Sequence, residues 1–169
     1  MTEPLTAALY FYLAGAWVDV SSDVQAASGI SASWGIRSNK STDLMADTGR
    51  MSFTLDNQTG KYSPGHGSAL TGWKKGVKVK LVTTYMSVDK VRWYGTVDEI
   101  SIDAGTVGNR KVRVIALDWL DYASNYPLNN PAVGIDQKAN QAVNTIVTAM
   151  LIQPLATDYH TGTNTFPTV

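Results

Sequence analysis

The stretch VRWYGTVDEISI, residues 91–102, decides the predicted fold, because its apolar side chains change faces partway along. Trp93 and Val97 stand at odd positions, whereas Ile100 begins an even-numbered series. Successive side chains of a strand point to opposite faces, so a one-residue slip inverts the buried face. A β-bulge near Asp98–Glu99 would restore that face, and bulges occur where strands bend around barrel corners. We therefore predict a long, bent strand of an antiparallel β-barrel.

Other short segments with alternating or aromatic-rich apolar patterns predict further strands. Residues 8–13 and 17–20, separated by Ala14-Gly15, are typical of a hairpin. The remaining strand candidates are residues 29–36, 51–55, 77–82 and 112–116. The chain is thus mainly β over residues 1–124, which we assign to a β-barrel domain.

The pattern changes after this domain. Two prolines and two adjacent asparagines in residues 125–135 indicate a linker. Apolar residues at spacings of three and four then predict an amphipathic helix over residues 136–153, with Asp136 as its N-cap. This helix is expected either to dock on the barrel or to begin a second domain. Residues 154–169 are Thr-rich and aperiodic, which predicts a coil tail.

Composition excludes several classes of function. The chain has 14 basic and 14 acidic residues, whereas a dedicated nucleic-acid binder would need a basic excess. It has no cysteine, so thiolate metal sites and cysteine nucleophiles are excluded. No segment reaches the ~18 apolar residues of a membrane span, so stable membrane insertion is not expected. We also expect no cofactor.

Candidate catalytic groups have ordinary alternatives. The pairs Asp98–Glu99 and Asp118/Asp121 could serve acid–base chemistry, but Asp118 and Asp121 also suit the start of a helix. Asp56 and Asn57 before Gly60 are typical turn residues. His66 is interpreted as an exposed loop histidine, since no partner is marked by spacing. The chain is therefore predicted not to be an enzyme.

Basic residues concentrate in the middle of the chain. Across adjacent strands they could form a positive stripe interleaved with Trp73, Trp93 and Tyr94, which would suit nucleic acid or an acidic partner. The alternative, which we favour, is that strands place lysines outward for solubility and to block edge pairing. The basic residues concerned are Lys74, Lys75, Lys78, Lys80, Lys90, Arg92, Arg110, Lys111 and Arg113.

Residues 56–76 form a long loop rich in turn residues, and a structureless loop of this length often serves binding or assembly. With the flanking strands, it carries a resemblance to a known family. Several runs, above all Leu-Asp-Asn…Gly-Lys-Tyr-Ser-Pro, resemble the N-terminal region of tail-tip or baseplate hub proteins, the minor tail proteins of tailed bacteriophages. The residues that carry this motif are Leu55, Asp56, Asn57, Gly60, Tyr62, Ser63 and Pro64.

The resemblance implies a structural virion protein in the phage tail, made in the host cytoplasm. Copies would form a trimeric or hexameric ring that joins the tail tube to the tip and lines or closes the DNA channel. Expected partners are copies of the chain itself, a tail-tube or distal tail protein, a tape-measure protein, a central fibre or spike, and DNA in transit. The long loop would clasp a neighbouring subunit, with Tyr62 and Trp73 as anchors.

An alternative function stays open from the residues alone. Five tryptophans and eight tyrosines would also suit a receptor- or carbohydrate-binding β-sandwich module of a tail tip, in which aromatic rings stack on sugars. Such a module would bind glycan as an isolated domain, whereas a hub protein would associate with itself.

Overall fold

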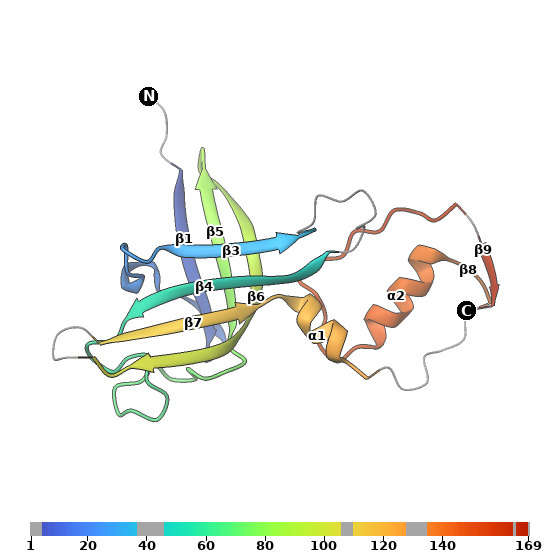
Figure 1. Ribbon diagram of the computed structural model, residues 1–169. Helices are drawn as coiled ribbons and strands as arrows, with labels where there is room; N and C mark the ends of the chain where they lie inside the picture. The colour runs from blue at the N-terminus through green and yellow to red at the C-terminus, as the bar shows by residue number, and fades with distance from the viewer. Residues whose placement is uncertain (1–4, 37–45, 106–109, 128–134, 164, 169) are drawn as a thin grey trace. The chain divides into compact units, whose positions relative to one another are not determined.

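The computed structural model describes residues 5–36, 46–105, 110–127, 135–163 and 165–168. The chain divides into two compact units, Met1–Leu120 and Asp121–Val169. Figure 1 traces the elements of both units.

The first unit is built on one antiparallel sheet in the order β2-β1-β5-β6-β7-β4-β3. This confirms the mainly β, antiparallel fold class. The strands are β1 (Thr6–Leu13), β2 (Ala16–Asp19), β3 (Ile30–Gly35), β4 (Asp47–Asp56), β5 (Lys78–Tyr85), β6 (Val88–Asp103) and β7 (Lys111–Leu117), with a short 3₁₀ turn, η1 (Ser21–Asp23), after β2.

The connection from β2 to β3 shows how strongly this sheet curves. Val20 N donates to Leu9 O on β1 at 2.9 Å, and Val24 forms a bridge with Leu55 on β4. Four residues span at most ~14 Å, whereas β1 and β4 would lie ~19 Å apart across a flat sheet at ~4.8 Å per strand. The sheet must therefore curl strongly enough for the short segment from Val20 to Val24 to reach from β1 to β4. Among the described residues, no ladder joins β2 to β3.

The predicted bulge is confirmed. In the β6–β7 ladder Val97 pairs with Ala116 and Glu99 pairs with Ile115, so Asp98 is the extra residue. Val97 is 1% exposed, and Ile100, beyond the bulge, again packs against the core. A second irregularity, at Leu81/Val82 in the β5–β6 ladder, was not indicated by the sequence.

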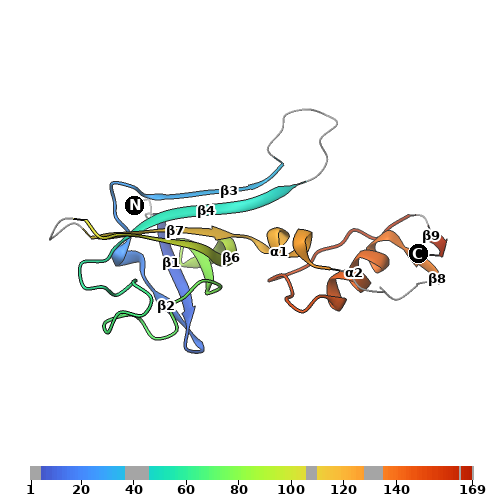
Figure 2. The same ribbon diagram turned by 60° about the horizontal axis from the view of Figure 1, so that its bottom comes forward.

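The predicted first hairpin is also confirmed, with Tyr12 opposite Trp17 and Leu13 opposite Ala16. Its turn residues Ala14 and Gly15 have φ values of 48° and 90°. The inward side chains of the sheet form one core with the loop after β4. In Figure 2 this loop lies on the same side of the β4 and β7 strands as the β1–β2 hairpin. Residues 37–45 and 106–109, where further loops were predicted, lie outside the described residues.

The second unit differs from its predicted form. It holds most of α1 (Trp119–Asn125), then β8 (Ile135–Lys138), α2 (Ala139–Ala149) and β9 (Thr165–Thr168). The predicted helix over 136–153 starts three residues late, and the Asp136 cap is wrong. Asp136 lies in β8 with a φ of 54°, and Lys138 is the N-cap.

The predicted coil tail over 154–169 contains β9, which pairs with β8. Pairing with β8 therefore makes a strand of residues whose sequence shows no strand pattern. The predicted linker over 125–135 lies mostly in residues 128–134, outside the described residues, and it stays a prediction.

A substitution at Gly95 tests the close packing of β6 against β7. A Cβ at this position would lie 2.1 Å from the carbonyl oxygen of Leu117 and 2.5 Å from the Trp93 ring. We expect Gly95→Ala to lower the free energy of unfolding by about 1–3 kcal/mol, because the backbone of β7 must move. Urea denaturation followed by tryptophan fluorescence measures the loss.

Gly67→Ala is the matched control, because a Cβ there meets nothing within 4 Å. Its effect should stay within about 0.5 kcal/mol. Equal stability of the two variants would contradict the tight contact of β6 with β7.

Candidate functional site

Three residues of the predicted family motif, Leu55, Asn57 and Tyr62, lie in the core of the chain. Asn57 is 2% exposed, although its amide is polar. Its Oδ1 accepts a hydrogen bond from Tyr62 N at 2.8 Å, and its Nδ2 donates to Ser63 Oγ at 2.8 Å. Since a buried amide is costly unless it is paired, these bonds explain how Asn57 shapes the turn through Gly60.

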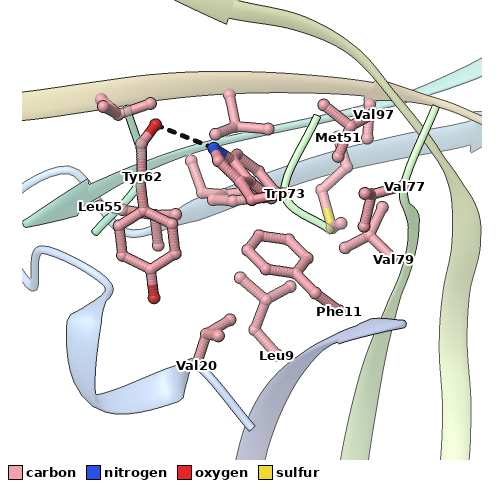
Figure 3. Packing of buried hydrophobic residues seen from close by; sticks show 14 of the residues in the cluster. Leu9, Phe11, Val20, Met51, Leu55, Tyr62, Trp73, Val77, Val79 and Val97 are labelled. Atoms are coloured by element: carbon pink, nitrogen blue, oxygen red, sulfur yellow. Dashed lines mark hydrogen bonds between the residues drawn. The ribbon is translucent and has the colours of Figure 1, made fainter. Parts of the chain in front are cut away.

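Tyr62 and Trp73 anchor the same loop from within. They are 0% and 4% exposed. Trp73 Nε1 donates to the Tyr62 carbonyl oxygen at 2.8 Å, as the dashed line in Figure 3 shows. The Trp73 ring centroid lies 4.7 Å from that of Phe11 and 5.6 Å from that of Tyr62. These two side chains thus hold the loop on the chain's own core, and they are not available on its surface. That the loop clasps a neighbouring subunit stays a prediction.

A small polar cluster ties this loop to η1. Asp23 accepts hydrogen bonds from Lys61 Nζ, at 2.5 Å, and from the Tyr62 hydroxyl. Burial raises the pKa of Asp23, but the hydrogen bonds from Lys61 and Tyr62 and the charge of Lys61 outweigh it, so the pKa lies below its ordinary value. Burial, the bond to Asp23 and its charge raise the pKa of Tyr62 well above its ordinary value. The cluster therefore fixes an ionised carboxylate against a neutral phenol.

The outer face of β2, β1, β5 and β6 carries what we call the aromatic–lysine face. The ammonium of Lys80 lies 4.4 Å from the Trp17 ring centroid and 5.1 Å from that of Tyr10. Trp17 also contacts Tyr12 and Tyr94 edge to face. The face consists of Tyr10, Tyr12, Trp17, Lys78, Lys80 and Tyr94.

This face differs from the positive stripe that the sequence left open as the less favoured interpretation. Tyr94 belongs to it, but Trp73 and Trp93 are buried, at 4% exposed each. Since its rings and lysines contact one another, the face resembles cross-strand packing that shields the outer surface. Tyr10, Tyr12 and Trp17 were missed as members, although their alternation on the first hairpin was the signal for them.

The candidate catalytic carboxylates have structural partners. Asp98 pairs with Lys75 at 2.9 Å, and Glu99 accepts from Ser101 Oγ at 2.7 Å. Asp118 Oδ1 accepts from Leu120 N at 3.0 Å, which confirms that it caps a helix start. In the part of the chain that the structure describes, no group of three or more His, Cys, Asp or Glu side chains could hold a metal ion.

The two loop motifs are local structure. Asp56 Oδ1 accepts from Gln58 N at 3.0 Å, as expected for a turn. His66 is exposed, and its ring covers Gly60, where a Cβ would lie 2.5 Å from Nδ1. Gly60 has a φ of 77°, so this position requires glycine for both its backbone and its contact. Among the described helices, none is long and apolar enough to pass through a bilayer.

Comparison with known protein families finds no family that matches this chain, and no curated protein matches its sequence. Among solved structures, one similar chain is the 43 kDa tail protein of prophage MuSo2 from Shewanella oneidensis, with a TM-score of 0.49 and 9% sequence identity. The match covers 85% of this chain but 38% of that protein, so this chain spans well under half its length.

Removal of the Asn57 amide tests its part in holding the loop. Asn57→Ala leaves the buried Tyr62 N–H without its acceptor, so the free energy of unfolding should fall by about 1–3 kcal/mol. Gln58→Ala, at the neighbouring exposed position, should change it by less than about 0.5 kcal/mol. Urea denaturation compares the two variants, and equal midpoints would rule out this role for Asn57.

The Asp23 cluster predicts a dependence of stability on pH at both extremes. A lowered carboxyl pKa stabilises the fold above its ordinary pKa of 3.8, and this contribution is lost as pH falls through the folded value. A raised phenol pKa stabilises the fold below 10.0, and this contribution declines as pH rises above it. Tyr62→Phe should therefore flatten the loss of stability both below pH 4 and above pH 10.

At neutral pH, Tyr62→Phe should cost about 1–3 kcal/mol, because Asp23 loses a hydrogen bond to its charge. Tyr12→Phe, at a tyrosine that is 40% exposed, serves as the control and should leave the pH profile unchanged. Denaturant midpoints between pH 3 and pH 11 give the profiles. Parallel profiles for wild type and Tyr62→Phe would contradict the coupling.

Proposed function

We propose that the chain is a structural protein of a phage tail, in the tail tip or baseplate hub, and that its copies form a ring. The observation that carries the proposal is the sheet order, in which β2 and β3 are the end strands and neither has a second partner strand among the described residues. An edge strand presents backbone N–H and C=O groups that another chain can pair with. Copies of this chain would complete those edges in turn.

The family motif supports an architectural role. Its conformation uses Asn57, Tyr62 and Gly60 for internal hydrogen bonding and packing. Asn57 bonds the backbone of Tyr62 and the side chain of Ser63, both within the motif, so these bonds maintain the shape of the subunit.

The proposal extends to partners and place. The ring would join a tail-tube or distal tail protein to a central fibre or spike, near the tape-measure protein, and DNA would pass through it. The protein would act without enzymatic activity, as part of the virion. These assignments follow from the sequence resemblance, and the strand edges are where the subunit contacts would begin.

The receptor- or carbohydrate-binding alternative finds less support. The strands of the first unit form one continuous sheet, whereas a β-sandwich needs two facing sheets. The aromatic–lysine face is the place where sugars would stack, but the rings of Tyr12, Trp17 and Tyr94 contact one another there.

A charge on the free edge tests ring formation. Ser31 is exposed on β3, and a lysine at an edge strand opposes pairing with another chain. We expect the wild-type chain to form trimers or hexamers in light scattering coupled to size-exclusion chromatography. Ser31→Lys should weaken this association at least about tenfold, or about 1.4 kcal/mol.

Ser101→Lys is the matched control, because Ser101 is exposed on β6, where it pairs with Arg113 of β7, and β6 is neither end strand of the sheet. It should leave the association unchanged. A wild-type chain that stays monomeric at every concentration would overturn the ring, and equal weakening by both variants would overturn the part played by β3.

A further inference from the structure

Large apolar side chains gather at the end of the β5–β6 hairpin. Tyr85, Met86 and Val88 are 52%, 62% and 55% exposed. Leu5, which is 65% exposed, precedes the first β1–β5 pair, Thr6 with Thr84, and so lies beside them. Figure 1 shows this hairpin extending beyond the β3 and β4 strands, beside the start of β1. A cluster of this kind on a surface usually marks an interaction site.

The turn at this end has a backbone conformation that its two residues disfavour. Tyr85 pairs with Val88, so Met86 and Ser87 form a two-residue turn, with φ values of 49° and 59°. Such turns favour Asn-Gly, because both residues are left-handed and a side chain there is strained. Methionine at this position destabilises the turn and is not part of the chain's core. Strain of this kind is found where a side chain serves a function.

A hollow of about 340 Å³ lies on one side of the hairpin end. Its apolar wall is Tyr85, Met86 and Val88, and its polar wall is Thr83, Lys90 and Arg92. Arg92 Nε donates to Thr83 Oγ1 at 2.8 Å. Within the described residues, neither Lys90 nor Arg92 forms an ion pair with a carboxylate.

The neighbouring carboxylate, Asp89, does not neutralise Lys90 and Arg92. Asp89 accepts a hydrogen bond from Thr84 Oγ1 at 2.6 Å. Because neighbouring strand residues point to opposite faces, Asp89 and Thr84 lie on the face away from Lys90 and Thr83. The hollow therefore combines an apolar end with two positive charges behind it.

We propose that this hairpin end binds the surface of an anionic phospholipid bilayer. At about 3.4 Å per residue, Lys90 and Arg92 stand about 7 and 14 Å behind Val88 along β6. Peripheral segments bury apolar side chains about 5–10 Å into the boundary between headgroups and acyl chains. With Met86 and Val88 at that depth, the two cations reach the phosphates, and the Tyr85 ring lies at the interface that tyrosine favours.

A bilayer fits this end better than a protein partner does. A stable protein interface buries about 800 Å² on each side, whereas the hairpin end presents four apolar side chains at the tips of three strands. A bilayer admits a narrow, projecting end of this kind without a matching surface. The binding is peripheral and reversible, and it does not depend on the proposed ring.

Flotation of the full chain with lipid vesicles tests the proposal. Wild type should bind phosphatidylcholine vesicles that contain about one third phosphatidylglycerol at least tenfold more tightly than pure phosphatidylcholine vesicles. Met86→Asn with Ser87→Gly supplies the favoured turn sequence and removes the apolar apex. It should raise the unfolding midpoint and lower vesicle binding at least tenfold. Lys90→Gln with Arg92→Gln should lower binding to the anionic vesicles alone.

Two controls match these changes elsewhere on the same unit. Trp34→Ser removes an apolar side chain that is 58% exposed on β3, and Lys74→Gln removes an exposed cation from the loop after β4. Neither should change vesicle binding. Failure of wild type to bind, or an equal loss in the controls, would overturn the proposal.

A second copy is the competing occupant. Sedimentation measures self-association of wild type and of the Met86→Asn, Ser87→Gly variant. If the variant loses self-association and wild type does not bind vesicles, the hairpin end is a contact between copies and the membrane proposal is wrong. Ser31→Lys lies on a different strand, so loss of the ring and loss of lipid binding are distinguishable.

Discussion

The hydrogen bond from the Trp73 indole to the Tyr62 carbonyl joins two distant parts of the long loop within the core. Without it, the buried Trp73 Nε1 would have no hydrogen-bond partner in the core, which is costly. Asn57 prepares this contact by setting the turn before Tyr62, and Asp23 completes it by holding the Tyr62 hydroxyl. The curled sheet thus depends on a polar framework at the centre of an apolar core.

Local alternation was enough to predict the strands of the first unit and the bulge of β6. The change of parity between Val97 and Ile100 is a property of neighbouring residues, and it located the bulge at Asp98. The bulge opposite Leu81/Val82 could not be found in this way, because Val91, Trp93 and Val97 keep the same parity through it. Likewise, β8 and β9 form by pairing with each other across the second unit, which no local pattern records.

The site residues show a similar division. The motif around Asn57 was visible as a sequence pattern, and its turn was predicted from residue type alone. The inward direction of Tyr62 and Trp73 was not, since aromatic residues serve both cores and interfaces. The aromatic–lysine face likewise depends on the order β2-β1-β5-β6, which brings Trp17 within reach of Lys80. A sequence shows which side chains have an unusual chemistry, but strand order decides which of them meet.

The pairing of β1 carries a consequence for synthesis of the chain. One side of β1 pairs at once with β2, but the other waits for β5, as the partnership of Leu9 with Leu81 shows. Chains grow at ~5–20 residues per second, so the first hairpin spends several seconds with Leu9, Phe11 and Leu13 uncovered. A hairpin with exposed apolar side chains is prone to aggregate. A cell that makes many copies at once must therefore either protect it with chaperones or lose some of the chains to aggregation.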